Sequence, residues 1–122
     1  MIIFSTDFNR VRISEEATQR LSLLKGRTGL TPNILCRIAF CLSLKEPGPP
    51  ETNQDSQGQE FNRYTLTGEW DSFYIALLKI RLMNDGLDPD IDQLARFKEH
   101  VERGVTLLHN RVKEFPDLTK LV

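Results

Sequence analysis

The chain has 122 residues, of which 39% are hydrophobic and 27% charged. These fractions are ordinary for a globular protein and exclude collagen-like and intrinsically disordered chains. The net charge is −1, but it is divided unevenly. Residues 1–45 carry seven basic and three acidic side chains, a balance of +4, whereas residues 46–122 carry nine basic and fourteen acidic ones, a balance of −5. An anionic ligand is therefore expected to bind the first 45 residues.

The sequence contains no run of eighteen apolar residues, and its N-terminus lacks a basic segment followed by a long hydrophobic one. We therefore expect no membrane span, no signal peptide and a cytoplasmic protein. Cys36 and Cys41 lie about 140° apart around a predicted helix, since each residue turns the helix by about 100°. Both are expected to be small buried hydrophobes in a reducing compartment.

Residues 10–44 predict a strand, a helix, a turn and a second helix. Alternation along the strand directs Val11 and Ile13 to one side and Arg10 and Arg12 to the other. Apolar residues 1–8 are expected to add a strand or an arm that packs on a neighbour.

Ser14 is a good N-cap for the first helix, which is expected to end near Lys25 and Gly26. Its apolar stripe consists of Ala17, Leu21 and Leu24, widened by Leu23. Thr31 followed by Pro32 predicts the start of the second helix. Its expected core face consists of Ile34, Leu35, Ile38, Ala39 and Leu42.

Residues 46–63 are rich in Pro, Gly and polar side chains and predict a linker or mobile loop. After a brief alternating stretch at 64–70, a third helix is expected to reach Asn84, with a core face of Phe73, Leu77, Leu78 and Leu82. Asp88 and Pro89 predict the start of a fourth helix of about 25 residues. Part of this helix is expected to pack against another subunit, and Gly104 to mark a close crossing with a neighbouring helix.

No motif for nucleophilic catalysis, phosphate-loop binding, zinc or iron–sulfur ligation occurs. Residues 88–99 match several ligand positions of a calcium loop, but Gln93 stands where that loop needs glycine. We therefore predict that the protein is not an enzyme and needs neither a metal nor another cofactor.

The residues predicted to contact DNA are Arg10, Arg12, Lys25, Arg27, Thr31, Arg37 and Lys45. Within this set, the turn at 25–29 combines two cations with two glycines just before a helix N-terminus, a combination that favours phosphate. The alternative is a plain turn whose charges are only solvated.

The strand, two helices and the turn sequence Gly29-Leu30-Thr31-Pro32-Asn33 resemble the ribbon-helix-helix family. This resemblance implies a ribbon of two strands from two chains. Its outward residues would be Phe8, Arg10 and Arg12, and Thr31 would hold a DNA phosphate. Phe8 and the acidic net charge depart from that family's pattern, so the turn at 25–29 is the preferred contact.

Over most of its length, through RVRISEEATQRLSLLKGRTGLTPNILCRIAFCLSL and FNRYTLTGEWDSFYIALLKIRL, the chain resembles the DndE family of bacterial DNA phosphorothioate modification. In those systems sulfur replaces a non-bridging phosphate oxygen, and the other components are a cysteine desulfurase, an iron–sulfur protein and an ATPase. The resemblance implies a component that binds the sugar–phosphate backbone of double-stranded DNA with little sequence specificity. The alternatives are a sequence-specific ribbon-helix-helix regulator and a protein-only scaffold of the modification complex.

The expected architecture is mainly α, with residues 1–122 forming one domain. It comprises a ribbon-helix-helix-like unit of a short strand plus two helices (1–45), a polar loop (46–63) and a helical extension of two further helices (64–122). We expect a homo-oligomer, with a tetramer favoured over a dimer. Whether the first strand pairs within the chain or between chains stays open.

Overall fold

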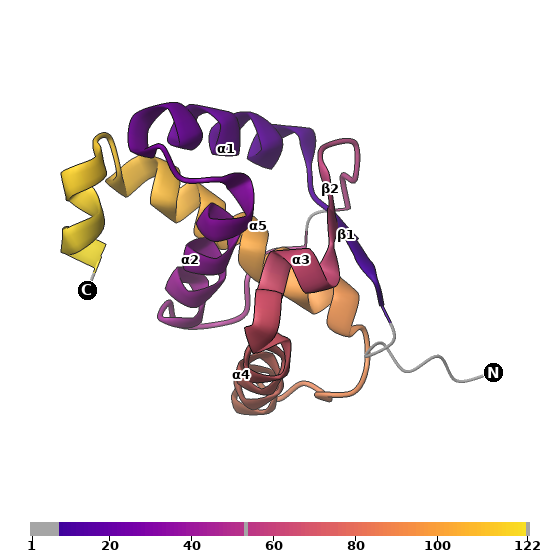
Figure 1. Cartoon of the computed structure of the whole chain (residues 1–122). Coiled ribbons are helices and arrows are strands. Elements are labelled where there is room, and N and C mark those ends of the chain that lie inside the picture. The colour runs from indigo at the N-terminus through magenta and orange to yellow at the C-terminus, as the bar shows by residue number, and fades with distance from the viewer. Residues whose placement is uncertain (1–7, 53, 122) are drawn as a thin grey trace.

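The computed structural model describes residues 8–52 and 54–121. The expected strand or arm at 1–8 lies outside these residues except for Phe8. The chain is mainly α, with a small sheet at one end (Figure 1). Its elements are β1 (Arg10–Arg12), α1 (Glu15–Thr28), α2 (Pro32–Leu44), β2 (Glu60–Asn62), α3 (Arg63–Thr67), the 3-10 helix η2 (Gly68–Trp70), α4 (Asp71–Asn84), α5 (Gln93–Arg111) and the 3-10 helix η3 (Phe115–Leu121).

The first strand finds its partner within the same chain. β1 pairs antiparallel with β2, so that Arg10 lies opposite Asn62 and Arg12 opposite Glu60. Val11 is buried and both arginines are exposed, as alternation predicted. The predicted order of strand, helix and helix is present. However, the strand that pairs with β1 consists of residues that we had expected to belong to the loop 46–63.

The N-terminal caps of the first two helices were predicted more accurately than the C-terminal end of α1. The Ser14 hydroxyl accepts a hydrogen bond from Ala17 N at 3.0 Å and so caps α1. α1 continues past the predicted end at Gly26 and stops at Gly29, whose φ of +77° suits glycine at a helix C-terminus. Thr31 begins α2 as predicted, with Pro32 in the first helical position.

The segment between α2 and β2 is anchored to the helices. Lys98 of α5 donates hydrogen bonds to the Asp55 carbonyl and, at 2.8 Å, to the Ser56 hydroxyl. Gly58 N donates to Ile13 O at 2.9 Å, and a Cβ on Gly58 would lie 2.2 Å from Ser14 O. Much of the predicted mobile loop is therefore packed against α1 and α5.

α5 is the central helix and packs against α2 and α1 of its own chain. A Cβ on Gly104 would lie 1.7 Å from the Ala39 carbonyl oxygen, so the close helix crossing predicted at Gly104 is confirmed and its partner is α2. α5 begins at Gln93, whereas Asp88 and Pro89 belong to the preceding turn, so the predicted start of this helix was wrong. The expected contact of part of this helix with another subunit stays a prediction.

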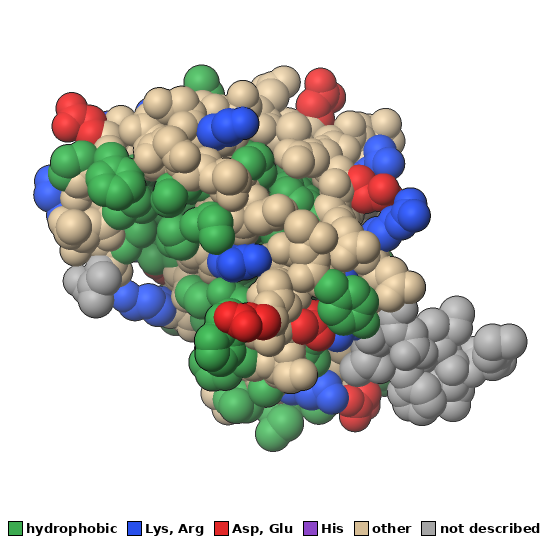
Figure 2. All heavy atoms as spheres, viewed as in Figure 1, with side chains coloured by type: hydrophobic (Ala, Val, Ile, Leu, Met, Phe, Trp, Pro, Cys, Tyr) green, Lys and Arg blue, Asp and Glu red, His purple; other side chains and the backbone are tan. Residues whose placement is uncertain are grey.

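α4 covers one end of the molecule and is apolar on two sides. Ile75, Leu78 and Leu82 face the interior, whereas Phe73, predicted to be in the core, is 58% exposed. Figure 2 shows hydrophobic side chains gathered over this helix, at the bottom of the view. The preceding residues 64–70, predicted as an alternating stretch, belong to α3 and η2 instead.

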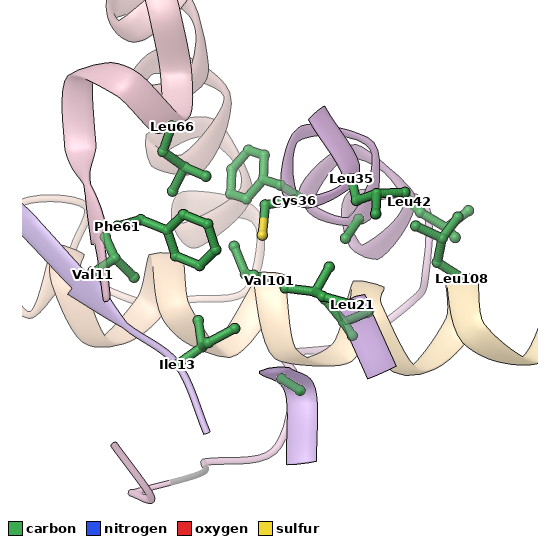
Figure 3. Packing of buried hydrophobic residues seen from close by; sticks show 14 of the residues in the cluster. Val11, Ile13, Leu21, Leu35, Cys36, Leu42, Phe61, Leu66, Val101 and Leu108 are labelled. Atoms are coloured by element: carbon green, nitrogen blue, oxygen red, sulfur yellow. The ribbon is translucent and has the colours of Figure 1, made fainter. Parts of the chain in front are cut away.

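One hydrophobic core joins the sheet to α1, α2 and α5. In Figure 3, Ile13, Leu21 from α1 and Cys36 from α2 lie around the α5 side chain Val101, and Val11 lies beside Phe61 of β2. The rings of Phe40 and Phe97 stack next to them with centroids 4.8 Å apart. This core fixes α1 and α2 against α5 and thereby positions the ends of these helices.

The two cysteines have different surroundings. Burial raises the pKa of Cys36 to about 12, with a smaller contribution from the charge of Glu102, so this thiol is an inert packing group. Cys41 is exposed, which contradicts the prediction that both are buried. Within the described residues, no helix is long and apolar enough to cross a membrane.

Candidate nucleic-acid interface

The strand arginines lie on the exposed face of the sheet with an acidic neighbour between them. Arg10 Nη1 is 3.4 Å from Glu60 Oε2, and Arg12 Nη2 is 3.6 Å from Glu60 Oε1. One carboxylate thus offsets part of the charge of two guanidinium groups. Exposed ion pairs of this kind contribute only about 0–1 kcal/mol, so a phosphate could displace the carboxylate.

Lys25 lies in the last turn of α1 rather than in the predicted turn between helices. Its carbonyl accepts a hydrogen bond from Gly29 N at 2.8 Å, which closes the helix. Its side chain is exposed, and among the sixteen Lys and Arg residues it alone forms no hydrogen bond or ion pair with the described part of the chain. Its ammonium group is therefore available to an external anion.

Arg27 joins the end of α1 to the end of α5. Its Nη1 donates to His109 O at 3.2 Å and to Val112 O at 3.3 Å, where the helix dipole of α5 favours a cation. Lys113 Nζ donates to the same His109 carbonyl at 3.1 Å. The C-terminal ends of both helices therefore lie together on one side of the molecule (Figure 1).

His109 is surrounded by these cations. Its pKa is lowered, first by partial burial and further by the charges of Arg27, Lys113 and Arg20, against a hydrogen bond with Asn110 that raises it. We call Arg27, His109 and Lys113, together with Lys25 two residues before Arg27 in the last turn of α1, the basic end. His109 and Lys113 were missed by sequence reasoning, because nothing in a single sequence joins residues more than 80 positions apart.

Thr31 stands at the N-terminus of α2, close in sequence to the basic end. Its backbone has the extended geometry of an N-cap (φ −71°, ψ 156°), but its side chain makes no capping hydrogen bond. Its hydroxyl group and the N-terminal dipole of a 13-residue helix therefore favour an anion at the start of α2.

The remaining two predicted cations serve the fold. Arg37 donates to Leu66 O at 2.6 Å and to Thr65 O at 3.2 Å, holding α3 against α2. Lys45 donates to Leu121 O at 3.0 Å and fastens η3. Both border a groove of about 320 Å³ with a mostly apolar lining, so the structure does not bring them together with the basic end.

A larger cavity of about 490 Å³ lies between α1, α5 and residues 49–52. Most of its charges have partners within the chain: Glu16 pairs with Arg20 at 2.5 Å, and the two Glu102 oxygens accept hydrogen bonds from the backbone and hydroxyl of Ser14. The contacts of Glu102 thus stabilise the start of α1, and the cavity offers an anion no free cation, since Arg20 and Arg103 are both hydrogen-bonded within the described chain.

The family model of the DNA sulphur modification protein DndE matches residues 10–114. The chain belongs to the DndE family. The family resemblance noted from the sequence is thereby confirmed, and the chain is assigned to DNA sulphur modification.

Solved structures agree with this assignment. The chain is similar to the crystal structure of DndE from Escherichia coli B7A, involved in DNA phosphorothioation modification, with 28% identity, a TM-score of 0.68 and coverage of 83% of this chain and 96% of that one. It is also similar to the G21/24K mutant of DndE involved in DNA phosphorothioation, with 25% identity, a TM-score of 0.67 and coverage of 83% and 97%. A comparison with curated proteins gave no match.

Proposed function

We propose that this DndE-family protein is the non-enzymatic DNA-binding component of a phosphorothioate modification complex, and that it holds the sugar–phosphate backbone through its basic end. The observation that carries the proposal is the convergence of α1 and α5, which brings His109 and Lys113 to Arg27 at the end of α1, the same turn that carries Lys25. The family assignment supplies the kind of reaction, and the basic end supplies a contact for its substrate.

Cations and a helix N-terminus are suited to phosphate rather than to base edges. Phosphate contacts position a protein on DNA without reading its sequence. In this proposal double-stranded DNA and the other components of the cytoplasmic modification machinery are the partners, and the protein acts as a homo-oligomer, with a tetramer favoured over a dimer. Several copies would multiply the phosphate contacts and make binding steeply dependent on salt.

A sequence-specific regulator is the second candidate, favoured by the exposed Arg10 and Arg12 on a two-stranded sheet. It predicts that one operator is bound at least ~10³-fold more tightly than random DNA. The third candidate is a scaffold that contacts only proteins, favoured by the exposed apolar side of α4. It predicts no DNA binding at any salt concentration.

The test is fluorescence anisotropy with unrelated duplexes across a salt series. The reversal variant carries Lys25→Glu and Lys113→Glu, two exposed side chains at the basic end. The matched control is Lys79→Glu on α4, which reverses one half-buried lysine outside the basic end. Arg27 is left intact because it holds α5.

Wild type and control should bind all duplexes with similar affinity. The slope of log K against log salt should be shallower in the reversal variant by about 1 per lost phosphate contact. Equal slopes in wild type and the reversal variant would refute DNA binding through the basic end. A strong preference for one DNA sequence would favour the sequence-specific regulator.

A further inference from the structure

A groove lies on the surface of the molecule between α2, α4 and the C-terminal η3. We call it the α2 groove, since most of its lining comes from that helix. Its volume is about 320 Å³ and its lining is mostly apolar, with walls formed by Ile38, Cys41 and Leu42 of α2, Tyr74 of α4 and Leu121 of η3. This volume is at the lower limit of small-molecule pockets and suits one or two large apolar side chains.

The apolar surface continues outside the α2 groove. Figure 2 shows hydrophobic side chains gathered between α2 and η3, on the left of the view, with basic side chains next to them. Phe115 at the start of η3 is 57% exposed. A shallow groove within a wider apolar surface is typical of a contact with another protein, which inserts anchoring side chains into the groove.

Two cations border the α2 groove. Arg37 and Lys45 lie eight positions apart on α2, which is about two turns or 12 Å. Their hydrogen bonds go to backbone carbonyls of α3 and η3, which orient the two cations without neutralising them. In the described part of the chain neither pairs with a carboxylate, and Glu46, next to Lys45, pairs with Arg111 at 2.9 Å. No acidic residue lines the groove, so its charge is complementary to an acidic partner.

We propose that the α2 groove binds an acidic amphipathic segment of another protein. Apolar side chains of that segment would enter the groove, and carboxylates on either side of them would contact Arg37 and Lys45. This is the mode in which an amphipathic helix lies in an apolar groove, with charges at the rim that fix its register. The apolar walls do not suit DNA, because most protein–DNA hydrogen bonds go to phosphate and sugar.

This inference is independent of the proposed DNA contact. No residue of the basic end lines the α2 groove. The family model ends at residue 114, so the wall that Leu121 supplies lies outside the matched residues. The groove therefore does not follow from the family assignment, and both sites could be occupied at the same time.

Cys41 gives a direct readout of occupancy. It is exposed in the α2 groove, whereas Cys36 is buried in the core, so a maleimide should label Cys41 selectively in the folded protein. A segment bound in the groove should shield this thiol. Labelling is followed by mass spectrometry of the intact protein.

The first experiment uses two synthetic helical peptides as probes. The acidic peptide has two leucines on the helix face between two glutamates that are eight positions apart, and the basic peptide has lysines in place of the glutamates. Fluorescence anisotropy should show that the acidic peptide binds at least ~10-fold more tightly, because like charges across an interface oppose association. The acidic peptide should also slow the labelling of Cys41.

The second experiment tests the position of the contact with variants. Cys41→Glu places a carboxylate inside the groove and should weaken binding of the acidic peptide at least ~10-fold, whereas Cys41→Ala should bind as wild type does. Lys45→Gln should weaken binding about 2–5-fold, as expected for an exposed charge pair. Its matched control, Lys79→Gln on α4, should have no effect. Circular dichroism checks that all variants are folded.

The other outcomes would overturn the proposal. These are no binding of the acidic peptide, equal binding of both peptides, or equal binding of the acidic peptide to wild type and Cys41→Glu. Shielding of Cys41 that rises with protein concentration alone would assign the groove to a second copy of the chain, and shielding by duplex DNA would assign it to DNA. The Lys25→Glu, Lys113→Glu variant should bind the acidic peptide as wild type does, so this proposal and DNA binding fail separately.

Discussion

Replacing Gly104 by alanine should destabilise the protein although alanine favours helices. The new Cβ would lie 1.7 Å from the Ala39 carbonyl oxygen and 2.2 Å from its carbonyl carbon, both of which are backbone atoms that cannot rotate away. α2 and α5 would have to separate by more than about 1 Å, and a gap of 0.5–1 Å already removes a quarter to a half of the dispersion energy of each contact.

The expected loss is about 3 kcal/mol in the free energy of unfolding. Overpacking costs about 1–3 kcal/mol or more, and the gain in helix propensity returns up to ~1 kcal/mol. Because α2 and α5 form the largest helix contact in the core, we place Gly104→Ala at the upper end of this range. The measurement is urea unfolding followed by circular dichroism, where the midpoint should fall without a change in slope.

Gly26→Ala is the matched control. Gly26 also lies within a helix, but a Cβ there would meet nothing within 4 Å, so this change should stabilise by up to ~1 kcal/mol. If Gly104→Ala proved as stable as Gly26→Ala, the close contact between α2 and α5 would be refuted.

Three further outcomes follow from the structure. Arg27→Ala should lower the free energy of unfolding by about 1–3 kcal/mol, measured by thermal melting, because the Val112 carbonyl loses its side-chain donor and the His109 carbonyl keeps only Lys113. Burial is the main reason that the pKa of His100 is lowered from 6.5 to about 4, and the nearby charges of Arg103 and Arg81 lower it further. The neutral imidazole therefore stabilises the fold above pH 6.5, and about 3 kcal/mol of the free energy of unfolding should be lost as the pH falls to 4. His100→Gln should remove that part of the pH dependence of urea unfolding, and an unchanged profile would contradict the assignment. Gly58→Ala should release the segment before β2 from α1, which limited proteolysis would detect as faster cleavage there than in wild type.

The neutral state of His100 is supported by its neighbours as well as by burial. Arg103 Nε donates to the Ser43 hydroxyl at 2.9 Å, which leaves the hydroxyl proton free to be donated to His100 Nδ1, also at 2.9 Å. A protonated imidazole would lose this acceptor and face Arg103 and Arg81 at close range. The charged form is therefore disfavoured inside the folded protein.

Local signals predicted the elements whose structure depends on local chemistry. Ser14 and Thr31 stand at the helix starts that were predicted, because N-capping involves only neighbouring residues, whereas the end of α1 at Gly29 was predicted three residues too early. β2 was missed because it is three residues long and lies in a polar segment, so that only its pairing with β1 defines it. Phe73 was assigned to the core because α4 is apolar on both sides, and periodicity alone cannot tell which side faces inward.

The candidate site was predicted in part for the same reason. Lys25 and Arg27 were recognised from a local cluster of cations and glycines, although they lie in a helix and not in a turn. His109 and Lys113 join them only through the packing of α1 against α5, which a single sequence does not reveal. Arg37 was predicted from its charge to contact DNA, but its guanidinium group donates hydrogen bonds to α3 and thereby stabilises the fold.

The most direct test of DNA binding through the basic end is photo-crosslinking from single positions. A photoreactive side chain at position 25 or 113 should crosslink to duplex DNA of any sequence, and the same group at position 79 on α4 should not. High salt should suppress the crosslinks, because phosphate contacts are electrostatic. Crosslinks from position 79 with none from positions 25 and 113 would contradict the proposed DNA contact.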